Sequence, residues 1–482
     1  MDPAQEGLSP FLIFLCIEIT IGFVVPVGYC FGVLNAIQKV IKEWAKETAS
    51  QRYSSSFGES ELTLVFASVA AIFQIGGIIG SLLGPLCNKK LGRRNTLLLA
   101  ALVYVISAIS HFVCRYAMLL ELLWLGRLLV GVAAGFVYTT QPTYLMEVAP
   151  PHLSGSVGVF TCIGIAFGIW MGQLFSFDFF WGTERYWHLA AAGYLIFVII
   201  GILPMYWFPE TPRMLIVNGK REEAKAALLR LRSNKDAVDK ELASIEAAVK
   251  SAVEPVGMIE LLRDKKFSIS MLIVCGFHFV QQGSGIGPVW YYSVAIFLSA
   301  GFDLKTSLWL NFAEGGLGFV SSLILPCVIP KLDRRILMSV SCLVCCLVLT
   351  LLAFGLAFMS AAKWIAFACI IVFSLFIIAF NMGLGPIPYF IGAEISEVPP
   401  RASLMGWGGL TNCAVNFVMV LIFPLINDAI GPYAFLPLAA ICPLGFLITL
   451  FFLPETRNKV PEEVAPLLQD GCKSKVWPKP KS

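Results

Sequence analysis

The chain has 482 residues, of which 57% are hydrophobic and only 14% are charged, with a formal net charge of +4 at pH 7. Soluble proteins carry about 25% charged residues, so this balance and a mean hydropathy of +0.79 predict a membrane protein. They exclude a soluble enzyme, a secreted disulfide scaffold and a nucleic-acid-binding protein.

Twelve apolar runs follow one another along the chain. A bilayer core about 30 Å thick requires about 20 apolar residues per helix. The runs therefore predict an all-α membrane protein with twelve transmembrane helices. They lie near residues 11–38, 62–88, 96–114, 118–147, 155–175, 187–208, 268–299, 307–330, 336–358, 364–393, 402–427 and 433–453.

Lys and Arg residues concentrate in the loops that follow the even-numbered runs and in the chain after the last run. Because basic loops remain on the cytoplasmic side of a membrane, both termini are predicted to be cytoplasmic. The loop after the first run is the exception, since it carries Lys39, Lys42, Lys46 and Arg52.

One long polar stretch separates the sixth and seventh runs. Its middle part, residues 220–253, is rich in Ala, Glu, Lys and Leu at helical spacing, which predicts amphipathic cytoplasmic helices. The expected organisation is a six-helix half, a helical linker, a second six-helix half and a cytoplasmic tail. These four parts cover residues 11–208, 209–267, 268–453 and 454–482.

Three short polar signatures occur twice, each time at predicted cytoplasmic helix ends. The two copies of each lie at a nearly constant separation, which predicts two parallel six-helix halves. The paired copies are 88–94 and 330–335, 144–151 and 394–401, and 209–213 and 454–457.

Together with Gln281-Gln282, Ser284-Gly285 and the segment 385–388 (Gly-Pro-Ile-Pro), these repeats resemble the sugar porter family of the major facilitator superfamily. More narrowly, the chain resembles the animal facilitative hexose transporters, from residue 11 to about residue 460. The resemblance implies a major facilitator fold whose substrate site lies between the halves. It also implies a plasma-membrane uniporter that moves a hexose or a related neutral polyol by alternating access, without enzymatic activity or a cofactor. The expected partners are this neutral solute and the lipid bilayer.

A neutral polyhydroxylated solute needs several converging polar groups, because each buried hydrogen bond contributes only about 0.5–1.5 kcal/mol. The seventh run offers two adjacent amides, Gln281 and Gln282, followed by glycines and a proline over residues 283–288. These residues are expected to interrupt the helix and to expose backbone groups beside a polar cavity. The alternative is that both amides only join neighbouring helices.

Further polar candidates lie later in the C-terminal half. Asn381 and Tyr389 flank a second segment rich in Gly and Pro, where a Tyr ring could stack on a sugar face. Close helix packing is the alternative role of this segment. The resemblance implies that Asn412 contacts the sugar, and Asn416 shares its helical face. Gln173 in the fifth run is interpreted as a packing residue.

The sequence departs from the family's sugar-binding set at five positions. The resemblance implies amide, carboxylate or Trp side chains where this chain has Cys162, Gly287, Gly318, Asn381 and Tyr389. The lost hydrogen bonds lower the expected affinity for glucose by orders of magnitude. Two alternatives therefore stay open: a carrier of a non-sugar solute, and a sensor or scaffold that no longer transports.

Charged residues at the predicted cytoplasmic helix ends form a candidate gate. The resemblance implies that they pair between the halves when the carrier opens outward and separate when it opens inward. Ser154 replaces an Arg of the family pattern and removes one partner. The alternative is that the basic members only set the topology. The candidates are Arg93, Arg94, Glu147, Arg213, Arg334, Arg335, Glu394 and Arg401.

Two carboxylates lie inside apolar runs, Glu18 in the first and Glu314 in the eighth. A charge at such a depth costs about 2.5–3.5 kcal/mol, so a functional role is the default hypothesis. The resemblance implies that proton-coupled relatives carry an Asp directly after Gly28-Tyr29, where this chain has Cys30, and this favours uniport. The alternatives are a proton-coupled sugar symporter that uses either carboxylate, and a passive position of both near helix ends.

No metal site is predicted. The histidines share no spacing typical of metal ligands, so they receive no metal or proton role. They are His111, His152, His188 and His278.

Overall fold

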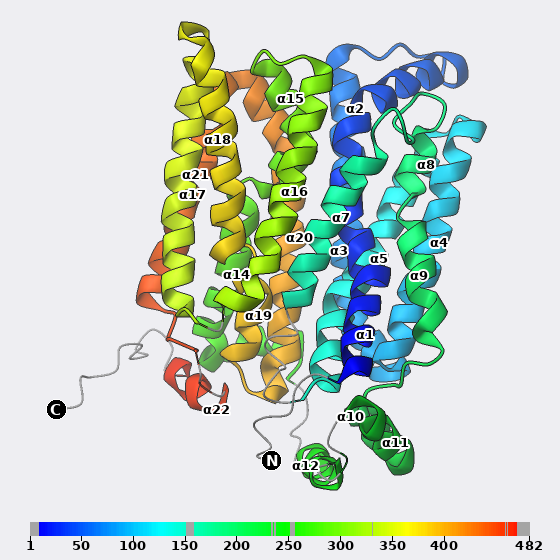
Figure 1. The fold of residues 1–482 in the computed structure, drawn as a ribbon, viewed down its shortest axis with the longest axis vertical. Helices are drawn as coiled ribbons and strands as arrows, with labels where there is room; N and C mark the ends of the chain where they lie inside the picture. Colours follow the sequence, from blue (N-terminus) through cyan, green and yellow to red (C-terminus); the bar gives the residue numbers. More distant parts are fainter. Residues whose placement is uncertain are drawn as a thin grey trace, which may run out of the picture.

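The computed structural model describes residues 9–150, 159–232, 235, 238–250, 256–329, 331–457, 459 and 461–469. Within these ranges all regular secondary structure is helical, as the apolar runs predict. The long helices form two groups that stand side by side, with short helices beneath one end (Figure 1).

The first group contains the six spans of the N-terminal half. Span 1 continues from α1 through a π-helical segment into α2, and span 6 is divided into α8 and α9. The bounds are α1 Pro10–Ile19, the π segment Thr20–Val24, α2 Val25–Arg52, α3 Glu59–Leu91, α4 Arg93–Ala117, α5 Leu120–Val148, α7 Val159–Phe175, α8 Trp187–Ala192 and α9 Leu195–Met205.

The second group contains the six spans of the C-terminal half. Span 7 is divided into α14 and α15, and span 10 into α18, a π-helical segment and α19. The bounds are α14 Ser268–Gly283, α15 Ile286–Ser299, α16 Leu304–Val328, α17 Arg334–Ala357, α18 Lys363–Ala379, the π segment Phe380–Leu384, α19 Ile387–Glu394, α20 Val398–Ile430 and α21 Phe435–Phe451, with 3₁₀ turns at Met359–Ala361 and Gly431–Ala434.

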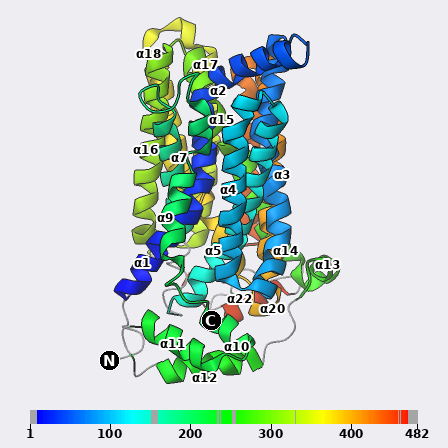
Figure 2. The ribbon, with the colours of Figure 1, turned by 90° about the vertical axis from the view of Figure 1, so that its right-hand side faces the viewer.

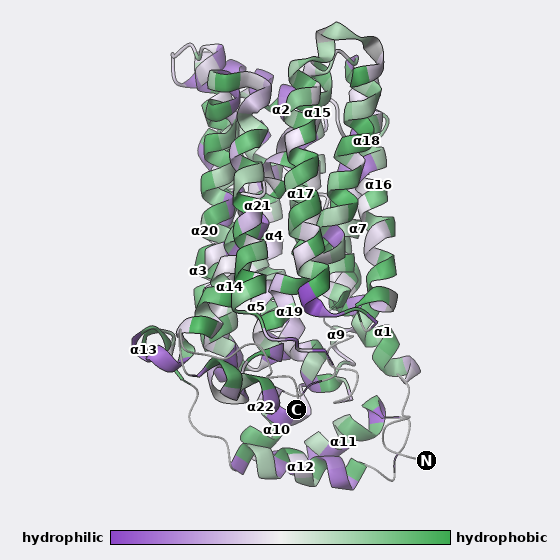
Figure 3. Cartoon of the chain, turned by 90° about the vertical axis from the view of Figure 1, so that its left-hand side faces the viewer, coloured by the Kyte–Doolittle hydropathy of each residue, from purple (hydrophilic) through white to green (hydrophobic). Residues whose placement is uncertain are grey.

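Ten helical stretches in the described chain are long and apolar enough to cross a membrane. One of them, Pro400–Phe451, contains most of α20 and all of α21 and therefore two spans. The apolar α7 is shorter, at 17 residues. Counted in this way, the described helices provide the twelve predicted spans. Apolar residues cover both groups along their length, and polar residues gather at the two ends (Figure 3).

Short helices lie beneath the two groups at one end of the molecule, which we call the linker end (Figure 2). We call the other end of the molecule the opposite end. Buried Arg232 holds the linker to the N-terminal half, because it donates to Val148 O at the end of α5 and pairs with Glu241 at 2.6 Å. The bounds are α10 Pro212–Val217, α11 Arg221–Leu231, α12 Val238–Lys250, α13 Met258–Arg263, a 3₁₀ turn Lys265–Phe267, and after the last span α22 Pro461–Val464 and a 3₁₀ turn Ala465–Leu468.

Span 1 differs from the expected boundary, because α2 continues to Arg52 and includes the basic residues expected in a loop. Charged residues at helical spacing explain the extension: Lys39 and Glu43 lie four residues apart and pair at 3.8 Å. Lys42 also donates to Thr63 of α3 at 3.0 Å. The basic residues that the sequence placed in the first loop therefore lie on a helical extension of span 1.

Glycines allow helices of the N-terminal half to touch backbone to backbone. A Cβ at Gly28 of α2 would lie 2.0 Å from the carbonyl oxygen of Ile165 in α7. One at Gly80 of α3 would lie 2.1 Å from that of Val132 in α5. Only residues without a side chain permit this approach, so these glycines set the separation of the two helix pairs.

Candidate functional site

Span 7 is interrupted near its middle, as its glycine-rich segment predicts. α14 ends at Gly283, and Gly285 has a φ of +85°, a left-handed conformation that other residues rarely adopt. A Cβ at Gly285 would also lie 2.4 Å from the Leu438 side chain. The break leaves Gln281 and Gln282 buried at the end of α14.

Span 10 is interrupted by the π segment Phe380–Leu384. The Ser341 hydroxyl of α17 pairs with backbone groups at both ends of this segment. It donates to Ala379 O at 2.7 Å and accepts from the Leu384 N–H at 2.9 Å. Backbone groups of a broken span are thus satisfied by protein, as a membrane interior requires.

Gln281 joins the two breaks. Its Nε2 donates to Leu384 O at 3.1 Å and to Gly385 O at 2.6 Å. Its Oε1 accepts from Asn412 Nδ2 at 2.6 Å, and the same Nδ2 lies 3.1 Å from His278 Nδ1. Groups from α14, span 10 and α20 are therefore connected by hydrogen bonds. We call the three side chains of this set, His278, Gln281 and Asn412, the amide cluster.

A second amide pair lies next to the amide cluster. Gln282 Oε1 accepts from Asn416 Nδ2 of α20 at 2.6 Å. Asn416 Oδ1 is buried and has no hydrogen-bond partner within the described residues. Three of the predicted binding residues, Gln281, Gln282 and Asn412, are thus brought together by α14 and α20.

Tyr389 extends the amide cluster to the other half of the molecule. Its ring stacks on Tyr138 of α5, with centroids 6.3 Å apart and planes at 21°. The His278 ring meets Tyr389 edge-on, with centroids 5.4 Å apart and planes at 77°. Both geometries are favourable for aromatic pairs. An aromatic contact between the halves therefore lies beside the buried amides.

Asn381, the remaining predicted binding residue, makes its described contacts elsewhere. Its Nδ2 donates to Gly318 O at 3.0 Å and to Ser321 Oγ at 2.7 Å, both on α16. Asn381 thus ties the π segment of span 10 to α16. Of the other departures from the family pattern, Gly287 lies against Asn416, since a Cβ there would be 3.0 Å from Asn416 Oδ1.

Near the opposite end, a hydrogen-bond network joins the two halves. Asn35 Nδ2 of α2 donates to Ser293 Oγ of α15 at 2.6 Å and to Asn311 Oδ1 of α16 at 3.2 Å. Gln173 of α7 donates to the same Asn311 oxygen at 3.0 Å. All four side chains are buried. Gln173, interpreted from sequence as a packing residue, therefore bridges the halves.

Arg127 is a buried cation in α5 that sequence analysis missed. It donates to Val69 O and Cys30 O, each at 3.2 Å, and to the Tyr291 hydroxyl of the other half at 3.4 Å. Its guanidinium also lies 4.9 Å from the centroid of the Phe73 ring. Carbonyl oxygens, a hydroxyl and a ring face therefore replace a carboxylate around this charge.

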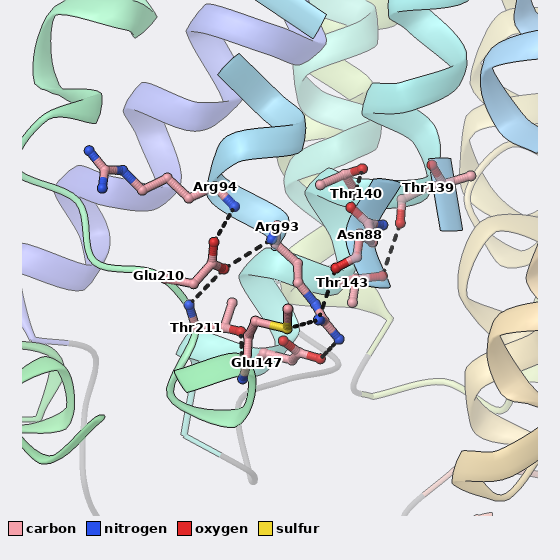
Figure 4. A network of polar contacts seen from close by, with 10 residues as sticks. Asn88, Arg93, Arg94, Thr139, Thr140, Thr143, Glu147, Glu210 and Thr211 are labelled. Carbon is pink, nitrogen blue, oxygen red and sulfur yellow. Dashed lines mark hydrogen bonds and ion pairs between the residues drawn. The ribbon is translucent and has the colours of Figure 1, made fainter. Parts of the chain in front are cut away.

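At the linker end of the N-terminal half, two carboxylates bind the start of α4 (Figure 4). Arg93 pairs with Glu147 of α5 at 2.9 Å. The Glu210 carboxylate accepts from the N–H groups of Arg93, Arg94 and Thr211, at 3.0, 3.1 and 2.9 Å. Burial raises the pKa of Glu210, while these three N–H groups favour its charged form and limit the rise. Glu210 thus caps the positive end of the α4 dipole.

The C-terminal half repeats this arrangement at the start of α17. Arg334 pairs with Glu394 at 3.1 Å. The Glu455 carboxylate accepts from the N–H groups of Arg334, Arg335 and Arg457, at 3.1, 3.3 and 2.9 Å. The duplicated sequence signatures therefore build the same structure twice.

Several of the predicted gate residues have described partners within their own halves in this conformation. Arg93 and Arg334 each pair with a carboxylate of the same half, and pairing between the halves in an outward-open conformation stays a prediction. Arg401 donates to Ser396 O of its own half. Arg213 makes no hydrogen bond or ion pair within the described residues, and Ser154 lies outside them.

Both intramembrane carboxylates are incompletely paired. Glu314 of α16 is buried, its Oε1 accepts from Ser374 Oγ of α18 at 2.7 Å, and its Oε2 has no partner in the described chain. Glu18 Oε2 is likewise buried without a described partner, near the end of α1 and two residues before the π segment of span 1. Glu314 therefore lies well inside a span, away from the helix ends.

Four residues in these sites received no role from the sequence. His278 lies three residues before Gln281 and thus on the same helical face, a spacing that could have indicated it. The charge of Arg127 inside an apolar run was a second available signal. Glu210 and Glu455 were visible only as parts of a duplicated signature.

The chain is similar to known proteins both in sequence and in fold. A family model described as "Sugar (and other) transporter" matches residues 15–468. The facilitated glucose transporter member 7 of solute carrier family 2 from Mus musculus is 31% identical over 464 residues, which cover 96% of this chain and 90% of that protein. Member 3 from Homo sapiens is 31% identical over 462 residues, which cover 95% and 92%. The structure of the major facilitator superfamily proton:xylose symporter XylE bound to 6-bromo-6-deoxy-D-glucose is similar in fold, with a TM-score of 0.81 at 20% identity over 96% of this chain and 100% of that one.

Proposed function

The chain belongs to the family of sugar (and other) transporters, and from this premise we propose that it is a uniporter for a hexose or a related neutral polyol. The observation that carries the proposal is the amide cluster with its neighbours. Gln281, Asn412 and Gln282 supply neutral hydrogen-bonding groups at the breaks of spans 7 and 10. Tyr389 adds an aromatic face beside them. Neutral amides and a ring face suit a solute with many hydroxyls and no charge.

Alternating access is supported by where the two halves are hydrogen-bonded. Near the opposite end, Asn35, Ser293 and Asn311 bond across the interface. At the linker end, the ion pairs Arg93–Glu147 and Arg334–Glu394 each stay within one half. A few neutral hydrogen bonds change the free-energy difference between two conformations by only a few kcal/mol. A carrier can therefore break and re-form them in each cycle.

Uniport is supported by the surroundings of Arg127. Its described partners are the carbonyl oxygens of Val69 and Cys30 and the hydroxyl of Tyr291, and none of these titrates near neutral pH. Cys30 occupies the position where the resemblance implies an Asp in proton-coupled relatives. The intramembrane cation thus has no acid with which to exchange a proton, and the solute gradient alone supplies the driving force.

Proton-coupled symport is the second candidate, and Glu314 favours it. Its buried carboxyl has one hydrogen bond, from Ser374, and one oxygen without a described partner, so the surrounding protein compensates a charge there only in part. A change of its surroundings during transport would therefore move a proton. The variant Glu314→Gln, which keeps the shape and removes the proton exchange, distinguishes the two candidates.

We propose that the linker end faces the cytoplasm, because the linker between spans 6 and 7 is rich in Lys and Arg. The plasma membrane is the proposed location, because a carrier driven by the solute gradient alone is useful where such a gradient is maintained.

The test is uptake by proteoliposomes that contain the purified protein, with a panel of labelled hexoses and polyols and with or without a pH gradient. We expect saturable uptake of one solute at a rate that does not depend on the pH gradient. This uptake should be lost in the double variant Gln281→Ala/Gln282→Ala. The matched control is Gln51→Ala on the exposed extension of α2, which should transport normally.

Two outcomes would contradict uniport of a sugar. Uptake that requires the pH gradient and becomes independent of it in Glu314→Gln would establish symport. Absence of uptake of every solute, from protein shown to be folded, would favour a non-sugar substrate or a sensor.

A further inference from the structure

An apolar groove opens on the outer edge of the N-terminal half, where α4, α8 and α9 lie side by side (Figure 1). Its volume is about 330 Å³, and sites for small ligands have volumes of about 300–1,000 Å³. None of the ten residues that line the groove carries a charge, an amide or a hydroxyl group in its side chain. The groove lies toward the opposite end, because its lining residues come from the last third of α4 and the first part of span 6. A ligand there must be held by apolar contacts.

Small residues create the groove. Ala192 and Gly193 lie at the joint between α8 and α9, and Ala108 lines the groove from α4. A Cβ at Gly193 would lie 2.4 Å from the Tyr29 hydroxyl oxygen and 3.0 Å from the Trp181 ring. Glycine thus lets span 6 pack directly against α2, and the groove is left on the outer side of the joint.

The mouth of the groove faces the surrounding membrane. Ile109 and Phe112 of α4 and Ile196 and Ile199 of α9 line the groove and are also exposed on the surface of the half. In a transmembrane protein such residues contact hydrocarbon chains. Water finds few hydrogen-bond partners in an apolar space, and such spaces bind apolar molecules instead. The occupant must therefore offer an apolar part and enter the groove from the bilayer.

A cation lies beside the groove, on the side of the opposite end. Arg115 follows Phe112 by three residues on α4 and is close enough to His188 of α8 for an electrostatic interaction. The Phe112 ring packs on the His188 ring with centroids 5.5 Å apart, so α4 and α8 meet there. Arg115 is half-buried, and its side chain makes no hydrogen bond or ion pair within the described residues. Such a guanidinium suits a phosphate, whose oxygens can accept two of its N–H groups.

We propose that the groove is a phospholipid site, in which one acyl chain fills the groove and the phosphate of the same lipid pairs with Arg115. A phospholipid fits better than a sterol, because a sterol offers one neutral hydroxyl and cannot compensate the charge of Arg115. The bound lipid packs across the joint between α8 and α9 and holds the six-residue α8 against α4. The proposal goes beyond sugar transport, since it requires only that the chain lies in a membrane.

The test is photolabelling of the purified protein in detergent, titrated with a phosphatidylcholine that carries a diazirine on one acyl chain. Peptide mass spectrometry locates the labelled residues. We expect the labelling of residues 108–112 and 189–199 to saturate at one lipid per chain. Labelling of the exposed face of α21, which has no such groove in the described structure, should instead rise in proportion to the lipid added.

Three variants separate the groove from the cation. Ala192→Trp fills the groove and should reduce its labelling to the level found on α21. The matched control is Ala440→Trp on the exposed face of α21, which should leave the saturating labelling unchanged. Arg115→Gln keeps the groove and removes the charge. It should raise the lipid concentration at half-saturation about threefold, the size expected for one partly exposed ion pair.

Groove labelling that does not saturate, or that persists in Ala192→Trp, would overturn the proposal. If Ala192→Trp does not fold, Ile196→Trp serves as the second variant, because it covers the groove from its exposed rim. An unchanged half-saturation in Arg115→Gln would overturn the phosphate contact. A photoreactive sterol that labels the groove in place of the phospholipid would overturn the choice of occupant. Absence of sugar uptake would refute the proposed function and leave the lipid site intact.

Discussion

The two halves of the molecule share their linker-end structure but differ in how their interiors pack. Glu210 and Glu455 cap equivalent helices in the same way. In the N-terminal half, however, glycines such as Gly28 and Gly80 face backbone atoms of the next helix. In the C-terminal half, glycines such as Gly276 meet the ends of side chains, and Gly383, which faces Leu337 O, is an exception. The first half is therefore built from closely fixed helix pairs, and the second leaves room for adjustment.

The two halves also differ in the polar groups at the interruptions of their spans. The interruptions of spans 7 and 10 lie in the C-terminal half and are joined by Gln281, which donates to two carbonyl oxygens at the break of span 10. The π segment of span 1 in the other half is held by a close contact, since a Cβ at Gly22 would lie 2.4 Å from Gly201 Cα. From this comparison we propose that the N-terminal half is a rigid frame and that spans 7 and 10 change conformation when the solute binds.

The largest expected effect tests the rigid frame. Gly80→Ala places a Cβ 2.1 Å from the Val132 carbonyl oxygen, and backbone cannot yield as a side chain can. We expect the variant to lose about 3 kcal/mol of stability. The C-terminal counterpart Gly276→Ala meets only the Ile448 Cδ1 atom at 2.6 Å, and better helix propensity offsets about 0.5–1 kcal/mol. Thermal unfolding in detergent compares the two, and equal losses would refute the proposed difference between the halves.

The next effect tests the junction of the two breaks. Gln281→Met fills the same space but leaves Leu384 O and Gly385 O without their donor, and each unpaired carbonyl costs about 1–3 kcal/mol. We expect uptake to fall about a hundredfold. Gln282→Met, which loses only the Asn416 contact, should lower it about tenfold. Initial uptake rates measure both, and a larger loss in Gln282→Met would show that the junction does not control transport.

The sequence predicted features that depend on composition and periodicity, and missed those that depend on three-dimensional partners. Apolar runs and duplicated signatures predicted the twelve spans, and the glycines around Gly285 predicted the break of span 7. Asn381 and Gln281 looked alike as amides in apolar runs, yet Asn381 binds α16 and Gln281 binds the break of span 10. Which neighbour an amide faces is decided by helix packing, and no local pattern records it.

A smaller effect is expected at the network near the opposite end. Asn35→Ala removes the contacts to Ser293 and Asn311, each worth about 0.5–1.5 kcal/mol. The equilibrium should therefore shift about tenfold toward the conformation that is open at this end. Spin labels at exposed Gln51 and Lys305 would report a population with a longer distance between the halves.

The matched control is Ser176→Ala, which removes hydrogen bonds to Val33 O and Gly172 O within one half. It should leave the distance distribution between the labels unchanged. If both variants or neither changed the distribution, the network would not be what holds the opposite end together.

The smallest effect tests the structure that the halves share. Glu210→Gln and Glu455→Gln keep the side-chain size but weaken the interaction with the N–H groups at the start of α4 and α17. Loss of such a charged cap costs about 1 kcal/mol. Since the geometry is duplicated, both variants should lower the unfolding temperature by a similar, small amount, and the double variant by about the sum. A much larger loss for one of them would mean that the two caps differ in energy although they agree in geometry. The contrast between the halves would then extend to the linker end, where the sequence repeats itself most clearly.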